Sequence, residues 1–451
     1  MRWNTKYKRC WSKNISKIKE HISFINFDIL ALLFPLLLHI ILTFNNNLFF
    51  IINFILYILF ISIFNLKSLI YVLISILIYI FLKLSSNQFY IKEGNYNITG
   101  YITKTSQNFS IINTDAGNMI LYKKNQFLTS GSKVNFNADI IINNSINSFT
   151  LSNNIKYEIK NIDLINQEKN YEPIINKIKE FGSKYKYFKQ FWKLIVFGYI
   201  EEMEIYKNIS ELNVVHLLII SGMHFDILFN IIFWITKKII LKIPKFRFFN
   251  YTILLCYIMM LNNFVSALRA FFITIIKNEK KYFNIISGIN KYNGLIIILW
   301  IIFTLQNNLI FNYGTIISFL TSFSICVLNE LISLKNRIII KIKTFIIFII
   351  IYLINLPFLI AISEKINIFG LLFSILLTPL FEFLYIISIL FWFSPIFLNY
   401  CYYIFYKFII FLIYFSNPII NKYILDLNFI LYYTYSVVFL FFVLRSVKKL
   451  A

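Results

Sequence analysis

The sequence predicts a mainly α-helical, polytopic membrane protein of about 11 or 12 transmembrane helices, with a small external all-β domain of the OB type. Of its 451 residues, 59% are hydrophobic and 14% are charged, whereas a soluble domain carries roughly a quarter charged residues. The apolar residues form runs that approach the length of a membrane span. One polar segment, residues 85–170, interrupts these runs with short alternating patterns typical of strands.

Lysine and arginine indicate the orientation of the N-terminal part. Cytoplasmic segments of membrane proteins collect these residues, and five of them lie between positions 2 and 13. We therefore expect residues 1–26 to form a basic cytoplasmic tail, followed by N-terminal transmembrane helices in residues 27–84. The spans are predicted near 27–44, 48–66 and 68–84. Three crossings place residues 85–170 outside the membrane.

The external segment contains five short β-type runs, at residues 98–102, 110–113, 119–122, 134–142 and 157–162. Turn sequences separate them, and such a number of strands in about 75 residues suits an OB barrel. OB folds hold single-stranded nucleic acid by neutralising phosphates and stacking bases. The alternative is a solvated surface over an aromatic core. The candidates for a basic and aromatic face are Lys104, Lys123, Lys124, Lys133, Lys156, Tyr101, Phe109, Tyr122 and Phe136.

Residues 171–211 predict an amphipathic connector, and residues 212–451 predict a transmembrane core. The topology of the core places basic groups around Lys237, Lys277 and Arg337 in the cytoplasm, together with both chain termini. The net charge of +24 also suits an anionic partner, either membrane lipid or nucleic acid. The expected spans lie near 212–235, 248–263, 264–276, 294–310, 313–334, 344–363, 366–393, 396–416 and 428–446.

The stretch VVHLLIISGMHFD, residues 214–226, contains two of the four histidines. If it is helical, His216 and His224 lie about 80° apart around the axis, and neither has a partner at the i, i+4 spacing of a zinc helix. The four cysteines are scattered, so we expect no metal and no cofactor. Gly222 beside Ser221 indicates close packing or a broken helix, and polar groups at membrane depth usually face a cavity. Satisfied interhelical hydrogen bonds are the alternative explanation.

Two further polar residues lie in apolar surroundings. Arg269, in VSALRAFFITII, is expected to pair with an acid, line water or contact an anion, unless it snorkels to an interface. Glu382 follows Pro379, which kinks or starts a helix. Glu382 is a candidate partner for Arg269 or for a protonated histidine, and the sequence favours neither pairing.

Several of these segments together resemble the ComEC competence-protein family, the inner-membrane channel for DNA uptake. HLLIISGMH at 216–224 is similar to the family signature HLLAISGLH, and SALRA at 266–270 resembles SVLRA. NYG at 312–314, followed by SF at 318–319, resembles the D-x-GFQLSF region, and residues 374–380 resemble NLLAVPL. The order, the spacings, the early spans and the external strand-rich domain also match, so the resemblance covers most of the chain.

The resemblance implies a channel that passes single-stranded DNA across the cytoplasmic membrane, with a competence-type transmembrane core at residues 212–451 and no catalysis by the chain itself. The implied partners are single-stranded DNA, membrane lipid, and a DNA receptor, a nuclease and an ATPase of an uptake machine; a homo-oligomer is left open. Gly222 and Gly314 would allow close packing or helix breaks, and Arg269 would offer a cation to phosphate. The implied channel positions are His216, Ser221, Gly222, His224, Arg269, Gly314, Ser318 and Pro379.

The chain departs from the family pattern at several points. Thr315-Ile316 replaces the Phe-Gln after the glycine, and Ser374 stands where the family often has Asn. Many members continue into a metallo-β-lactamase-like domain with an HxHxDH motif, so we expect a short form without nuclease activity. No GxxxxGK[ST] loop occurs, which leaves a partner ATPase or the membrane potential as the driving force. The histidines available are His21, His39, His216 and His224.

Two other functions stay open at this level. An intramembrane serine hydrolase would use Ser221 as nucleophile with His224 or His216 as base, and it would need an oxyanion site. Labelling of Ser221 by a fluorophosphonate probe would favour this function. A permease for another solute predicts that a purified 85–170 fragment binds no DNA.

Overall fold

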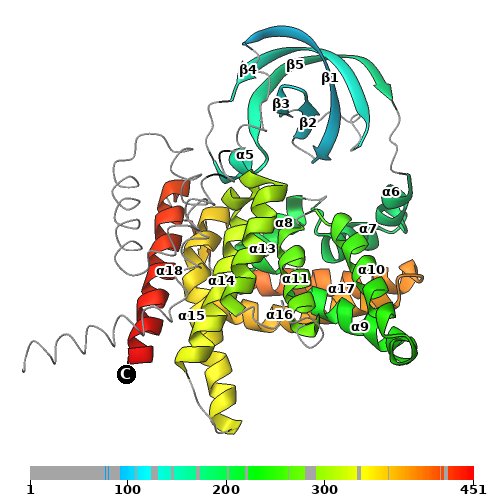
Figure 1. Ribbon diagram of the computed structural model, residues 1–451. Helices are drawn as coiled ribbons and strands as arrows, with labels where there is room; N and C mark the ends of the chain where they lie inside the picture. The colour runs from blue at the N-terminus through cyan, green and yellow to red at the C-terminus, as the bar shows by residue number, and fades with distance from the viewer. Residues whose placement is uncertain are drawn as a thin grey trace, which may run out of the picture.

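The computed structural model describes residues 77, 80, 92–106, 109–122, 131–143, 147–168, 173–200, 203–218, 222–262, 264–279, 291–332, 337–363, 365–416, 418–420 and 425–450. The predicted tail at 1–26 lies outside the described residues, and so do the predicted spans in 27–84 apart from two positions. A β-barrel lies over one end of a helical region (Figure 1). The C-terminal end of helix α18 (Leu427–Leu450) lies at the opposite end of that region.

The barrel consists of five strands: β1 (Gly94–Thr105), β2 (Ser110–Thr114), β3 (Gly117–Leu121), β4 (Lys133–Ile142) and β5 (Ile155–Glu168). They close in the order β1-β2-β3-β5-β4. Strands β3 and β5 run parallel, whereas the other neighbours are antiparallel. This arrangement confirms the predicted OB-like domain and each of its five predicted strands.

Alternation along the strands directs apolar side chains into the barrel. In β4, Val134, Phe136, Ala138 and Ile140 are buried, whereas Lys133 is exposed. Successive side chains of a strand point to opposite faces, so every second residue of β4 enters the core. The prediction that Phe136 belongs to an exposed aromatic face is therefore wrong, because its place in this alternation points it inward.

Helices form most of the remaining described chain. Short 3₁₀ turns (η) and a two-stranded sheet connect them. Up to residue 311 the elements are α5 (Ser148–Ser152), α6 (Pro173–Glu180), α7 (Lys186–Phe197), α8 (Met203–Glu211), η1 (Val215–Leu218), α9 (Gly222–Lys242), η2 (Pro244–Phe246), α10 (Arg247–Met259), α11 (Val265–Glu279), α13 (Lys291–Leu305) and η3 (Asn307–Phe311). After it come α14 (Tyr313–Leu331), α15 (Arg337–Ser363), β6 (Lys365–Asn367), α16 (Gly370–Leu390), α17 (Pro395–Tyr414), β7 (Pro418–Ile420) and α18.

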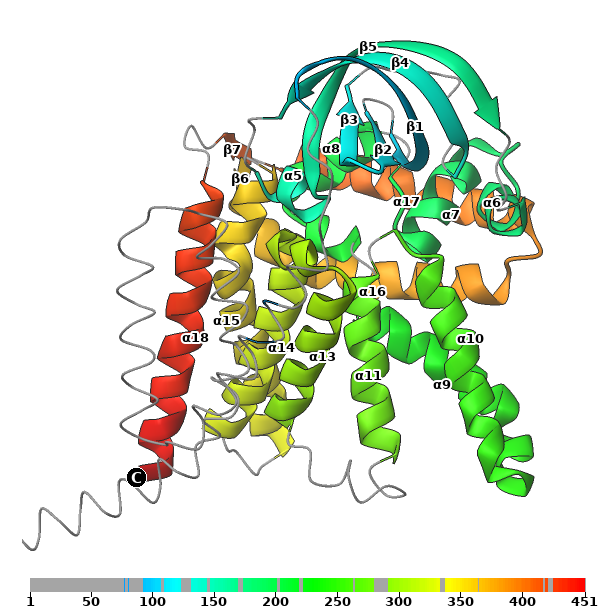
Figure 2. The same ribbon diagram turned by 45° about the horizontal axis from the view of Figure 1, so that its top comes forward.

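Four described helices are long and apolar enough to cross a membrane, namely α14, residues Ile342–Ser363 of α15, α16 and α17. Shorter apolar segments occur in α13 and α18. The chain is therefore a mostly helical membrane protein, as the sequence predicts, and the number of about 11 or 12 spans stays a prediction. Figures 1 and 2 show α14, α15 and α18 side by side, with α16 and α17 running across their direction.

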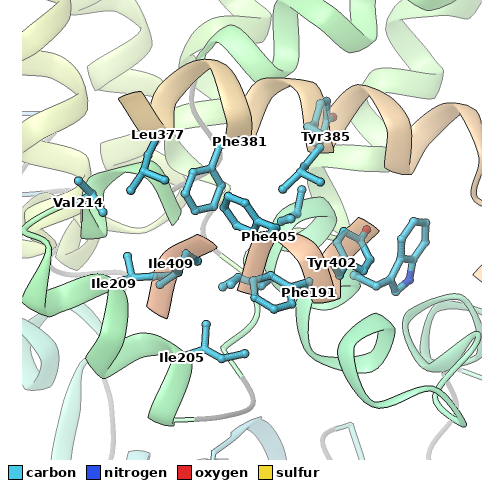
Figure 3. Close-up of a cluster of buried hydrophobic side chains, with 14 of the residues drawn as sticks. Phe191, Ile205, Ile209, Val214, Leu377, Phe381, Tyr385, Tyr402, Phe405 and Ile409 are labelled. Atoms are coloured by element: carbon cyan, nitrogen blue, oxygen red, sulfur yellow. The ribbon is translucent and has the colours of Figure 1, made fainter. Parts of the chain in front are cut away.

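A large cluster of buried apolar side chains joins α7 to α16 and α17 (Figure 3). Phe191 of α7 stacks on Tyr402 of α17, with ring centroids 5.7 Å apart. Phe381 of α16 packs edge-on against Phe405 of α17 at 5.0 Å. Residues 191–197 are all buried, because both α16 and α17 pack against α7. Helix α7, which the sequence places in the amphipathic connector, thus packs within the helical core.

The short helix α5, in the connection between β4 and β5, attaches the barrel to the helical region. The side chain of Asn147 caps α5 by accepting from the backbone N–H of Thr150 at 2.8 Å. Ser148 Oγ donates to the backbone carbonyl of Phe311 at 2.6 Å, and Leu151 packs against the same apolar cluster as Phe311. Because Phe311 ends η3 immediately before α14, the barrel is docked beside the start of α14 (Figure 2).

Candidate functional site

Arg269 of α11 is held by two serine hydroxyls of α14. Its Nε donates to Ser318 Oγ at 2.8 Å, and its Nη1 donates to Ser322 Oγ. Ser322 in turn donates to the backbone carbonyl of Ser318 at 2.8 Å. The ion pairs of the described residues do not involve Arg269. Neutral hydroxyl groups therefore orient the guanidinium and leave its positive charge in place.

Gly222, the first residue of α9, lies against the remaining guanidinium nitrogen, Nη2. A Cβ atom at position 222 would lie 3.4 Å from Nη2 and 3.6 Å from Cβ of Ala270. Within the described part of the chain, Nη2 donates no hydrogen bond. A guanidinium presents its donors in a fixed planar fork that matches phosphate and carboxylate oxygens. Glycine at position 222 thus places no side chain against Nη2.

The structure brings together three segments that lie far apart in the sequence. Gly222 comes from VVHLLIISGMHFD, Arg269 from SALRA and Ser318 from the segment that follows NYG. The sequence reasoning missed Ser322, the second serine that binds Arg269. The sequence could have identified Ser322, because residues four apart share one face of a helix and Ser322 follows Ser318 at that spacing.

Asp226 extends this polar group along α9 and was also missed. It lies four residues after Gly222, so the two share one helix face. Its carboxylate accepts a hydrogen bond from Thr274 of α11 at 3.4 Å and attracts Arg269 electrostatically. Because its side chain is exposed, Asp226 places a negative charge at the accessible border of the Arg269 group.

His224 is buried between packed helices. Its ring lies edge-on to that of Tyr385, with centroids 4.8 Å apart. The hydroxyl of Tyr385 donates to that of Tyr257 at 3.1 Å, and Tyr257 donates to the backbone carbonyl of Val196 at 2.7 Å. This chain of hydroxyl groups links α16, α10 and the end of α7. The ring contact of His224 thus joins α9 to α16, and the interhelical hydrogen bonds of the alternative explanation stay a prediction.

His216 lies in η1 and not in the helix that carries His224. The angle expected for a single helix therefore does not apply to the two histidines. Residues 219–221, with the candidate nucleophile Ser221, lie outside the described residues. The Nδ1 atom of His216 is buried and finds no hydrogen-bond partner in the described chain. No three His, Cys, Asp or Glu side chains of the described residues are grouped so that they could hold a metal.

The other predicted channel positions shape helices. Gly314 is buried in the first turn of α14, where its N–H donates to the capping side chain of Asn312 at 2.8 Å. Pro379 lies inside α16, which continues through it although proline lacks an N–H donor. The hydrogen bonds of Arg269 go to serines and its electrostatic attraction to Asp226, so the described contacts do not support pairing with Glu382.

The candidate nucleic-acid residues of the barrel fall into separate groups. Tyr101 of β1 and Lys133 of β4 are exposed cross-strand neighbours, and Lys133 also lies 4.0 Å from the carboxylate of Glu168. Lys104 donates to the side-chain oxygen of Asn153 at 2.9 Å. Two adjacent residues can thus offer a ring and a charge on one face, whereas Lys104 is already engaged.

Tyr122 is exposed just after β3, and β3 does not neighbour β1 in the barrel. Lys123 and Lys124, which follow it, lie outside the described residues. Phe109, in the loop between β1 and β2, packs edge-on against Phe149 of α5 at 5.0 Å. OB folds use this loop and the β4–β5 loop to bind oligonucleotides. Here α5 in the β4–β5 connection also docks the barrel, so both loops lie next to the helical region.

A family model described as Competence protein matches residues 195–447 of this chain. An uncharacterized protein of Mycoplasma genitalium is 28% identical over 200 residues, which cover 44% of this chain and 50% of that protein. The chain thus spans about half the length of the curated relative it matches. No solved structure matches the chain. Because the family match covers more than half of the 451 residues and contains the Arg269 group, the chain belongs to the Competence protein family.

Proposed function

We propose that the chain conducts single-stranded DNA across the cytoplasmic membrane and that Nη2 of Arg269 contacts its phosphates. Membership of the Competence protein family supports a role in DNA uptake. The four apolar helices of sufficient length support a membrane channel. In the proposed orientation residues 85–170 face outward and both termini are cytoplasmic, because the basic groups then fall on the cytoplasmic side.

This proposal rests on the orientation of the Arg269 guanidinium, which two serines fix. A DNA strand bears one negative charge per nucleotide and cannot enter hydrocarbon without compensation. Ser318 and Ser322 occupy Nε and Nη1, so the guanidinium need not reorganise when a phosphate arrives. Gly222 leaves space beside Nη2. A phosphate oxygen would therefore bind at Nη2 without displacing the serines.

The position of the barrel supports a continuous path for the strand. The barrel docks at Phe311, and α14, which carries both serines, begins two residues later. Tyr101 and Lys133 on its surface suit base stacking and phosphate neutralisation. A DNA receptor and a nuclease would supply the single strand, and a partner ATPase or the membrane potential would drive it.

Replacement of Arg269 by lysine tests the role of the guanidinium. In Arg269→Lys the charge is kept, but a single ammonium cannot bond both serines and still present an open fork. We expect uptake of labelled single-stranded DNA to fall about a hundredfold, because two charge-assisted hydrogen bonds of about 1.5 kcal/mol each are lost. The measurement is internalised label per cell at equal membrane levels of the protein.

The matched control is Lys160→Gln on β5 of the barrel. Lys160 is exposed and lies outside the proposed contacts with DNA, so uptake should stay within about twofold of the unchanged chain. Normal uptake by Arg269→Lys at normal membrane level would contradict the proposed function.

The described contacts do not favour the serine hydrolase. His224 of α9 packs against Tyr385, and His216 lies in η1. A fluorophosphonate probe provides an independent check: we expect it to leave Ser221 unlabelled, and labelling that disappears in Ser221→Ala would support the hydrolase.

A further inference from the structure

The end of α9, η2 and the start of α10 form a hairpin at residues 233–249, here called the α9–α10 hairpin. Figures 1 and 2 show it projecting from the helical region, at the end away from the barrel and on the side away from α18. Its large apolar side chains are uncovered: Trp234 is 78% exposed and Leu241 is 75% exposed. Ile235 and Ile243 are exposed as well.

Four exposed lysines share the same surface. Lys237 and Lys238 lie about one helical turn from Trp234, and Lys242 directly follows Leu241. Lys245 in η2 is the fourth. Apolar and cationic side chains therefore interleave instead of separating onto opposite faces. Water does not favour the apolar groups and hydrocarbon does not favour the ammonium groups, whereas the headgroup region of a bilayer solvates both.

The inner side of the hairpin is fixed by buried polar contacts. Asn250 Nδ2 of α10 donates to Thr236 Oγ1 of α9 at 2.8 Å, and both residues are buried. Arg247 pairs with the buried carboxylate of Glu279 in α11 at 3.0 Å. The hydroxyl of Tyr251 donates to the same carboxylate at 3.0 Å. The exposed lysines and apolar side chains are thus presented by a backbone tied to its neighbours.

We propose that the α9–α10 hairpin is a binding site for anionic phospholipids. The lysine ammonium groups would contact the headgroup phosphates, while Trp234 and Leu241 enter the boundary of the acyl chains. In the proposed orientation this end of the molecule is cytoplasmic, where anionic lipids give the membrane surface a negative potential. DNA leaving a channel is the other anion available there, but it would leave Trp234 and Leu241 in water. Lipid covers both kinds of side chain and is therefore the occupant that fits.

Binding of lipid at the hairpin has a consequence for the Arg269 group. Helix α9 begins at Gly222, beside Arg269, and ends at Lys242 in the hairpin. Lipid on the hairpin would hold the far end of the helix that borders the guanidinium. The lipid site itself does not depend on the proposed transport of DNA, so either proposal can fail alone.

The test reconstitutes the full chain in vesicles of phosphatidylcholine mixed with phosphatidylglycerol, extracts it in detergent, and quantifies both retained lipids by mass spectrometry. We expect enrichment of phosphatidylglycerol on the unchanged chain. In a variant with Lys237→Gln, Lys238→Gln, Lys242→Gln and Lys245→Gln, the enrichment should fall about tenfold or more, because four cationic groups near an anionic surface are lost. The matched control removes the same charge from the barrel by Lys92→Gln, Lys133→Gln, Lys156→Gln and Lys160→Gln and should keep the enrichment.

Two further measurements separate the explanations. Trp234→Ser should weaken retention of phosphatidylglycerol while all lysines remain, and gel filtration checks that each variant is folded. Unchanged enrichment in the hairpin variant would overturn the proposal, and so would an equal loss in the barrel variant. Displacement of the bound lipid by a single-stranded oligonucleotide would overturn it in favour of a DNA contact.

Discussion

The barrel and the helical region expose opposite kinds of side chain. In the barrel, Phe136 is fully buried and exposed large apolar residues such as Tyr101 are few. In the helical region, Trp234 and Leu241 are largely exposed, whereas Arg269 is bonded to serines between helices. Water is the solvent of the first region and lipid that of the second. Polar groups inside the second are costly and therefore mark function more clearly than polar groups on the first.

An ion pair in each region repeats this contrast, and the buried one gives the largest expected effect on stability. Lys133 and Glu168 have side chains 44% and 58% exposed, whereas Arg247 and Glu279 are 18% and 3% exposed. Glu279→Gln would remove the buried charge that pairs with Arg247 and accepts from Tyr251, so we expect the free energy of unfolding to fall by about 3 kcal/mol. Glu168→Gln should lower it by about 0.5 kcal/mol or less.

Chemical denaturation of the full chain in detergent, followed by tryptophan fluorescence, measures both values. Equal effects of the two substitutions would remove the contrast between the regions. The comparison also tests whether α10 and α11 are held together by the carboxylate of Glu279.

The same change at two glycines should act on stability in one region and on transport in the other. A Cβ at Gly100 of the barrel would lie 2.7 Å from Cγ2 of Ile112 and 2.8 Å from the carbonyl oxygen of Asn113. Gly100→Ala should therefore cost about 2 kcal/mol of stability by overpacking. Gly222→Ala meets Nη2 at an ordinary contact distance, so the chain should keep its thermal midpoint.

DNA uptake by Gly222→Ala should nevertheless fall about tenfold, the equivalent of one charge-assisted hydrogen bond of about 1.5 kcal/mol. Thermal midpoint and uptake are measured on the same preparations of cells. A lowered midpoint with normal uptake would show that Gly222 serves packing and not the contact of Nη2 with phosphate.

Two exposed tyrosines sharpen the comparison within the barrel. Tyr101 neighbours Lys133 across the strands, so Tyr101→Ala should weaken binding of single-stranded DNA by the full chain about tenfold, within the range known for loss of one stacked base. Tyr122 lies after a strand that does not neighbour β1, and Tyr122→Ala should change affinity less than about threefold. Tyr101→Phe keeps the ring and should bind normally. Fluorescence anisotropy with a labelled oligonucleotide ranks the three variants, and a larger effect at Tyr122 would move the binding face to β3.

The smallest effect is expected at the junction between the regions. Ser148→Ala removes the hydrogen bond to the carbonyl of Phe311, worth about 1 kcal/mol. Hydrogen exchange of the amides in η3 should then accelerate about fivefold. Ser152→Ala is the control, because the side chain of Ser152 bonds only to its neighbours in the chain, donating to the carbonyl of Phe149 at 3.2 Å and accepting from Asn153 Nδ2 at 3.5 Å. Identical exchange in both variants would mean that Ser148 does not hold the barrel in place.

The barrel could be predicted because each strand shows its alternation locally. The period of two that identifies β4 also assigns Phe136 to the interior with Val134 and Ala138, and using that period would have avoided the wrong assignment of Phe136. The start of a separate helix at Gly222 could also be predicted from local sequence, because glycine interrupts an apolar run there. The burial of α7 could not be predicted from its own residues, because it depends on α16 and α17, which come much later in the chain.

The Arg269 group shows the same limit. The sequence identified Gly222, Arg269 and Ser318 as separate positions, but their contacts cross three helices and no local pattern encodes them. Glu382 was considered as a partner because a buried arginine calls for an acid. The structure instead bonds Arg269 to two neutral serines, and the acid that attracts it is Asp226 and not Glu382. Ser322 was detectable through its spacing of four residues from Ser318.

Voltage-driven passage of single-stranded DNA through the purified full chain in a planar bilayer tests the central claim most directly. The applied voltage replaces any ATPase, and labelled DNA is counted on the far side. We predict passage through the unchanged chain and through Lys160→Gln, with about a hundredfold less through Arg269→Lys. Equal passage through Arg269→Lys and the unchanged chain would contradict the account.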